Sequence, residues 1–204
     1  MRILAKTISY LFHPMFMSIV GVILILNMDL FIHYSSPQSL RFVLLIVSLA
    51  TFLLPLSLVP FYLHQKIIDS IEMEDKKERF IPLLVTSFIY YMTYLVMKKL
   101  MITEIILAFV MASASIVFVI SVLTNYFKVS IHMTGLGGIF GLLIYLSVTF
   151  HLNILNYLAI VIIISGVTGM ARLMLNSHKP YEVYAGWGIG AVLVFFIMRI
   201  YLGA

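Results

Sequence analysis

The sequence predicts an all-α fold, a polytopic membrane helix bundle, and three observations support this prediction. Of the 204 residues, 63% are hydrophobic and only 10% are charged, whereas a soluble domain carries about 25% charged residues. Seven apolar stretches approach the ~20 residues that a helix needs to cross about 30 Å of hydrocarbon. The short segments of alternating polarity that build a membrane barrel do not occur, so we expect all seven stretches to be helices.

The expected spans follow one another with short loops. They cover residues 8–28, 40–63, 81–97, 102–126, 133–150, 153–170 and 183–202. We expect about six core transmembrane helices, with the first span as one additional N-terminal helix. No repeat or linker divides the chain, so residues 1–204 are predicted to form a single transmembrane domain.

Two spans contain residues that shape helices. Pro55 and Pro60 are expected to bend the second span, because proline removes a backbone donor and clashes with the preceding turn. The fifth span has four glycines, whose lack of side chains allows close backbone approach. These are Gly135, Gly137, Gly138 and Gly141.

The charge and the cysteine content limit the classes of ligand and partner that we expect. The net charge of +5 comes from few residues, and no basic run interleaved with aromatic residues occurs. Anionic lipid headgroups or a phosphate-bearing ligand are therefore favoured, and no nucleic-acid partner is expected. Without cysteine, the chain forms neither disulfides nor thiolate metal sites. We expect an integral multi-pass protein of a bacterial inner membrane, surrounded by membrane lipids.

Polar residues gather in three clusters, each beside a loop on the same expected face of the membrane. The first cluster, residues 72–82, places Lys76 and Arg79 three residues apart, so both cations can face one site. A solvated loop of mixed charge is the alternative explanation of this cluster. The second cluster, residues 128–135, ends in the fifth span and contains His132. That histidine alone is more often a hydrogen-bonded interfacial residue than a catalyst.

The third cluster, residues 172–186, combines a cation, an imidazole and a carboxylate between two apolar spans. Four residues separate His178 from Glu182, so on a helical turn the carboxylate can accept a hydrogen bond from one imidazole nitrogen. The other nitrogen is then unprotonated and nucleophilic. The alternative is an Arg172–Glu182 ion pair that anchors the loop, but such a pair leaves His178 unexplained.

The three clusters together resemble the signature of the type 2 phosphatidic acid phosphatase superfamily. That signature consists of Lys-x6-Arg-Pro, then Pro-Ser-Gly-His, then Ser-Arg-x5-His-x3-Asp, and the resemblance covers residues 76–190. The matching residues are Arg79 for the first motif, Ser130 and His132 for the second, and Arg172, His178 and Glu182 for the third. The first motif departs most, because Glu72 stands where its lysine is expected and Lys76 or Lys77 must substitute.

The resemblance implies a metal-independent phosphatase or phosphotransferase that acts on a lipid phosphate through a phosphohistidine intermediate, with no cofactor. It makes His178 the nucleophile, His132 the acid that protonates the leaving group, and Glu182 the residue that orients His178. A ring of donors would hold the phosphate, as phosphoryl transfer requires. Its members would be Arg172, Arg79, Lys76, Lys77, Lys128 and Ser130.

Two other functions are compatible with parts of the sequence. A non-catalytic relative that binds or translocates a phospholipid or polyprenyl phosphate is the alternative, motivated by the divergent first motif. An ion or solute transporter is disfavoured, because residues 81–97 and 133–150 contain no charged residue or histidine. The remaining histidines have no charged neighbour at a useful spacing and are interpreted as interfacial residues. They are His13, His33, His64 and His151.

Overall fold

The computed structural model describes residues 1–28, 37–71, 73 and 75–203, so Glu72, Glu74 and His33 lie outside the described residues. Over these ranges the chain is helical without strands, which confirms the all-α prediction. Seven helices within them are long and apolar enough to cross a membrane, one for each predicted span. They are Arg2–Leu26, Gln38–His64, Lys77–Lys99, Glu104–Leu123, Ile131–Phe150, Leu155–Met174 and Pro180–Leu202.

Contacts divide the chain into two compact units, which are described separately. The first unit comprises Met1–Met17 and Tyr126–Ala204, and the second comprises Ser18–Asn125. The single domain expected over residues 1–204 stays a prediction.

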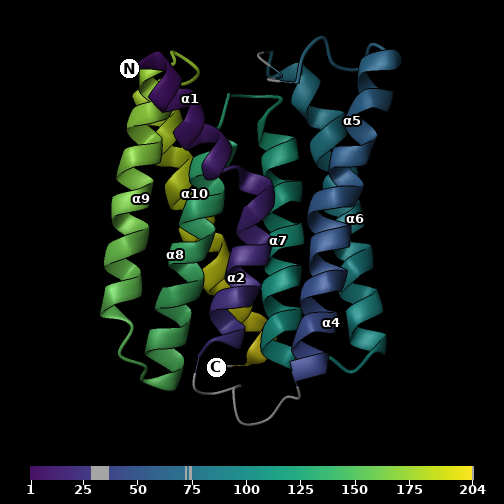
Figure 1. Cartoon of the computed structure of the whole chain (residues 1–204), viewed down its shortest axis with the longest axis vertical. Coiled ribbons are helices and arrows are strands. Elements are labelled where there is room, and N and C mark those ends of the chain that lie inside the picture. Colours follow the sequence, from purple (N-terminus) through teal and green to yellow (C-terminus); the bar gives the residue numbers. More distant parts are fainter. Residues whose placement is uncertain (29–36, 72, 74, 204) are drawn as a thin grey trace. The chain divides into compact units, whose positions relative to one another are not determined.

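The first unit is built from four helices and a short 3₁₀ turn. These are α1 (Arg2–Leu11), η1 (Pro14–Phe16), α8 (Ile131–Phe150), α9 (Leu155–Met174) and α10 (Pro180–Leu202). Figure 1 shows that α1 and α10 begin at the same end of this unit and that α9 ends there. Residues that are distant in the sequence therefore meet at this end.

Glycine residues, which have no side chain, allow α8 and α10 to come into close contact. A Cβ atom at Gly137 or Gly141 of α8 would collide with the backbone of Trp187 or Ala191 of α10, and one at Gly190 with the backbone of Thr134. Such small-residue contacts are a usual way for helices to associate in lipid, where apolar surface alone does not favour association. The close approach predicted for the fifth span is confirmed.

The first candidate span is broken near its middle. α1 ends at Leu11, and His13 adopts an extended conformation with ψ of 137° directly before Pro14, which starts η1. A residue that precedes proline is disfavoured in the helical region, because the proline ring clashes with its backbone. The chain then continues as α2 (Met17–Leu26).

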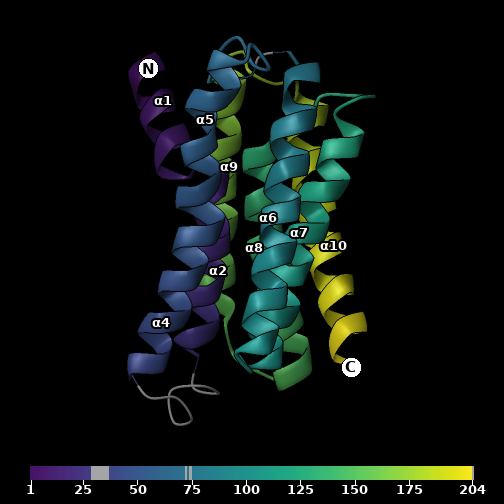
Figure 2. The same cartoon turned by 90° about the vertical axis from the view of Figure 1, so that its right-hand side faces the viewer.

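The second unit contains the remaining helices, in which α4, η2 and α5 run as one continuous rod (Figure 2). Its elements after α2 are α4 (Pro37–Ser48), η2 (Leu49–Leu53), α5 (Leu54–His64), η3 (Lys77–Arg79), α6 (Phe80–Lys99) and α7 (Glu104–Leu123). The irregularity expected from Pro55 takes the form of η2, a π-helical turn. Pro55 has no amide hydrogen for the carbonyl of Thr51, and the Tyr90 hydroxyl donates to that carbonyl at 3.0 Å instead.

Candidate functional site

The predicted contact between His178 and Glu182 is present at the start of α10. Nδ1 of His178 lies 2.9 Å from Oε2 of Glu182, and their side chains are only 2% and 7% exposed. The same carboxylate oxygen accepts a hydrogen bond of 3.2 Å from the backbone amide of Lys179, the residue directly before α10. Because the carboxylate accepts a hydrogen bond from Nδ1–H, a neutral His178 carries its lone pair on Nε2.

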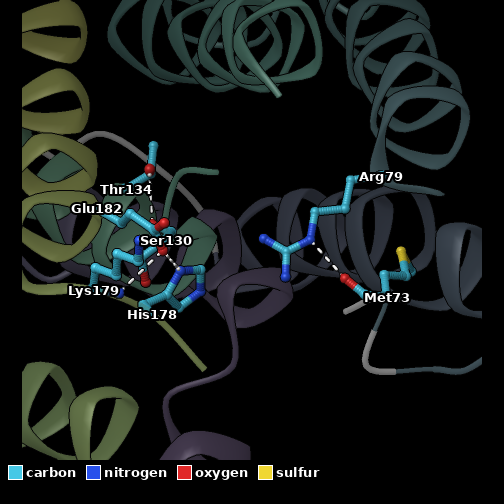
Figure 3. Close-up of polar contacts among 7 residues, drawn as sticks. All are labelled: Met73, Arg79, Ser130, Thr134, His178, Lys179 and Glu182. Atoms are coloured by element: carbon cyan, nitrogen blue, oxygen red, sulfur yellow. Dashed lines mark hydrogen bonds and ion pairs between the residues drawn. The ribbon is translucent and has the colours of Figure 1, made fainter. Parts of the chain in front are cut away.

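The second and third clusters meet where α8 and α10 begin. The backbone amide of Ser130 donates to the carbonyl of Glu182 at 3.2 Å, and the Thr134 hydroxyl donates to the carbonyl of Ser130 at 3.0 Å. Figure 3 shows these residues side by side with His178 and Lys179. Gly186 permits the contact, because a Cβ atom there would lie 2.7 Å from the Ser130 carbonyl oxygen.

His132 lies one turn into the same region, on α8. Its Nε2 is 3.1 Å from the carbonyl oxygen of Ser9 on α1, and its ring is half-buried. Arg172, His13 and His178 are all close enough to interact electrostatically with it. The two histidines of the predicted motifs thus share one end of the first unit.

Arg172 occupies the last turn of α9 and is half-buried. No residue in the described ranges forms a hydrogen bond or ion pair with its guanidinium, and its Nε is buried without a partner. Within the described part of the chain Glu182 forms its ion pair with His178 and not with Arg172, so the alternative of an Arg172–Glu182 ion pair is wrong. A guanidinium without a hydrogen-bond partner among the described residues is suited to bind an anion such as phosphate.

Buried side-chain atoms without a partner concentrate in the first unit. Among the described residues there are four, and every one belongs to this unit: Ser9 Oγ, Ser130 Oγ, Thr168 Oγ1 and Arg172 Nε. Ser9 and Ser130 lie on the segments that hold His132, and Thr168 stands one helical turn before Arg172. Buried polar groups are rarely left unpaired, so each requires an explanation. All four are donors, which is the character that a phosphate site requires.

The positions of the other predicted phosphate ligands give less information about phosphate binding. Lys128 is half-buried and belongs to the first unit, two residues before Ser130. Lys76, Lys77 and Arg79 belong to the second unit, and their part in phosphate binding stays a prediction.

The first cluster has a clear local structure. Arg79 is 5% exposed, and its Nε donates to the carbonyl of Met73 at 2.8 Å (Figure 3). The acidic residues also make local contacts: Oδ1 of Asp75 accepts from the amide of Lys77 at 3.0 Å, and Oε2 of Glu78 from the amide of Asp69 at 3.3 Å. The contacts of the described residues agree with the alternative of a mixed-charge loop, in which Arg79 is buried.

Three residues of this region were not predicted from the sequence. His13 meets His132 edge to face, with ring centroids 5.4 Å apart and planes at 80°. Ser9 and Thr168 contribute the unpartnered hydroxyl groups. The only signal for His13 in the sequence was its position before Pro14 in an apolar span, which marks a helix break but not its partner.

No His, Asp or Glu residues within the described ranges form a group of three or more arranged to hold a metal ion. The fold and the site define an α-helical protein whose described residues include seven helices suited to span a membrane and a buried His–Glu pair at one end of a helical unit. No family model matches the chain, and no match is found among curated proteins or solved structures.

Proposed function

We propose that the protein is a multi-pass enzyme of a bacterial inner membrane that transfers the phosphoryl group of a lipid phosphate to water through a phosphohistidine. The observation that carries this proposal is the buried contact of 2.9 Å between His178 Nδ1 and Glu182 Oε2. A histidine oriented by a carboxylate presents its other nitrogen as a nucleophile or base. A purely structural His178–Glu182 pair would not explain why Arg172, whose Nε has no partner among the described residues, and a second histidine, His132, lie close by.

In the proposed first step, Nε2 of His178 attacks phosphorus in line with the bond to the lipid oxygen. The new P–N bond forms as that P–O bond breaks, and its electron pair leaves with the lipid alkoxide. His132 gives the alkoxide a proton. The carboxylate of Glu182 stabilises the positive charge on the phosphorylated imidazole, because it stays hydrogen-bonded to Nδ1.

In the second step, water attacks phosphorus and passes a proton to His132. The P–N bond breaks, its electron pair returns to Nε2 of His178, and inorganic phosphate is released. Negative charge on the phosphoryl oxygens is greatest in both transition states, where fixed donors stabilise it most. Arg172 and the Ser130 hydroxyl are assigned this role, because Arg172 Nε and Ser130 Oγ are buried without a partner among the described residues.

A lipid substrate follows from the position of the site in the chain. His178 lies in the turn between two helices that are suited to span a membrane, Leu155–Met174 and Pro180–Leu202. A phosphate at such a turn can carry an acyl or prenyl tail that stays in hydrocarbon. Phosphatidate-like lipids and prenyl phosphates both fit this requirement.

The test is phosphate release by the purified protein in detergent micelles from phosphatidate and from prenyl phosphates. We expect turnover in the parent and a fall of at least about 10³-fold in His178→Ala, since nucleophile removal leaves only binding and electrostatic effects. His64→Ala, an exposed histidine of the second unit, is the matched control and should retain parent activity.

Trapping the intermediate makes the test more specific. After brief mixing with phosphorus-labelled substrate and denaturation in base, the parent should retain an acid-labile label that His178→Ala lacks. Saturable binding of the lipid without any phosphate release would instead support the alternative, a protein that binds or translocates a lipid phosphate.

A further inference from the structure

The break in the first span leaves the backbone carbonyl of Ser9 without its usual partner within the helix. In a continuous helix, the amide of His13 would donate to the carbonyl of Ser9 four residues earlier. His13 is instead extended before Pro14, and α1 closes with a hydrogen bond of 3.0 Å from the amide of Phe12 to the carbonyl of Ile8. The Ser9 carbonyl accepts from His132 Nε2 at 3.1 Å.

The chain after the break packs tightly on the same turn of α8. A Cβ atom at Gly135, one turn beyond His132, would lie 2.7 Å from Cγ of Met17 and 3.7 Å from Cα of Pro14. The ring of His13 meets that of His132 edge to face at 5.4 Å. The segment 9–17 therefore contacts His132 through both a backbone carbonyl and an aromatic ring.

These contacts determine which nitrogen of His132 carries the proton. A carbonyl oxygen only accepts, so Nε2 of His132 must be the donor, and the neutral ring carries its lone pair on Nδ1. Nε2 stays committed to Ser9 in every protonation state. Proton exchange with a reacting group must then pass through Nδ1.

We propose that the broken segment 9–14 is a positioning element for His132 and that His13 is a positioning residue. The Ser9 carbonyl fixes the tautomer, and the His13 ring fixes the plane of the imidazole. In the imidazolium form of His132, Nδ1 carries the second proton: it gives that proton to the leaving alkoxide, which leaves the neutral Nε2–H ring, and later takes a proton from water. The catalytic consequence rests on the proposed function, whereas the tautomer does not.

The kinetic test uses two substrates with different leaving groups. Pro14→Ala lets the chain continue as a helix, so the His13 amide can take the Ser9 carbonyl away from His132. An alkyl lipid phosphate needs a proton on its leaving oxygen, but a nitrophenyl phosphate does not. We expect kcat for the alkyl ester to fall about 10²-fold or more, as for loss of a general acid, with little change for the aryl ester.

Variants of His13 separate ring packing from folding. His13→Ala should show the same selective loss, and His13→Phe should recover much of the alkyl activity, because a phenyl ring preserves the edge contact. Pro60→Ala, an exposed proline of another candidate span, is the matched control and should leave both activities unchanged. Equal losses on both substrates in Pro14→Ala and His13→Ala would overturn the positioning role.

A spectroscopic measurement keeps this inference separate from the proposed function. Nitrogen NMR of ring-labelled histidine, assigned with His132→Gln, should show His132 protonated at Nε2 in the parent and a mixture of tautomers in Pro14→Ala. If the parent has no phosphatase activity but shows this change, the positioning stands and the function fails. An Nδ1-protonated His132 in the parent would refute the positioning whatever the activity.

Discussion

Oε2 of Glu182 and Nδ1 of His178 lie 2.9 Å apart on one turn of chain, with both side chains almost sealed from solvent. Sealing a carboxylate is unfavourable unless it is paired. Here the imidazole and the Lys179 amide at 3.2 Å both donate to the same oxygen. The pair therefore fixes the imidazole rather than merely neutralising a charge.

Glu182→Gln tests the charge of this pair while preserving its shape. The amide oxygen still accepts from Nδ1 but no longer stabilises a positively charged imidazole. We expect kcat for phosphate release to fall about 10²- to 10⁴-fold, with KM changed much less. Steady-state kinetics in detergent measures both constants, with Glu104→Gln, an exposed glutamate, as the control. Retention of parent kcat in Glu182→Gln would contradict the proposed role of the carboxylate.

Arg172→Lys tests whether the unpaired guanidinium binds a phosphate. Lysine keeps the charge but loses the planar fork that binds two oxygens at once, so a fall in kcat of about 10-fold or more is expected. Arg172→Ala should cost about 10²- to 10³-fold, the effect of removing a donor from an anionic transition state. Arg2→Lys, at the exposed N-terminus, should behave as the parent.

The same variants should lower affinity for inorganic phosphate as an inhibitor of the reaction. If the Arg172 variants bind phosphate as tightly as the parent, the guanidinium serves packing alone.

Local features of this site were predictable, and those that join distant segments were not. The His178–Glu182 contact follows from a spacing of four residues at a helix start, so the sequence contains it in full. Ser9 and His132 are 123 positions apart, and their contact needs both the break at His13 and the bare backbone of Gly135. The sequence indicates a helix break at His13 and close helix packing at the glycines of residues 135–141. It does not indicate that the broken segment packs against those glycines.

The contact of α8 with α10 provides a stability test with an internal control. Gly190→Ala places a methyl group against the Thr134 backbone, and such overpacking costs about 1–3 kcal/mol. Gly188→Ala, on the same helix, meets no atom within 4 Å and should stabilise the protein by up to about 1 kcal/mol through helix propensity. Thermal unfolding in detergent should therefore shift in opposite directions for the two variants. Similar shifts would contradict the packing.

The absence of cysteine makes the path of α9 directly testable. If Leu155–Met174 crosses the membrane, exposed residues before and after it lie on opposite faces. We expect single cysteines at Asn153 and Tyr181 to react oppositely with an impermeant thiol reagent in intact cells, and the parent chain to give no signal. Equal labelling at both positions in intact cells would refute the crossing.

Tyr90 and Pro55 form the second place where proline frees a carbonyl for a side chain of another helix. Tyr90→Phe leaves the Thr51 carbonyl without its hydrogen bond of 3.0 Å and should destabilise the protein by about 0.6–1.7 kcal/mol. In a Pro55→Ala background the restored amide can satisfy that carbonyl, so Tyr90→Phe should cost much less. A double-mutant cycle of unfolding free energies measures this coupling, with the half-exposed Tyr91→Phe as the control. Strict additivity of the two changes would mean that the proline does not determine the use of the tyrosine hydroxyl. A positive coupling would show that this chain repairs a proline break in a helix with a side chain from a neighbouring helix, the arrangement that Ser9 and His132 also adopt.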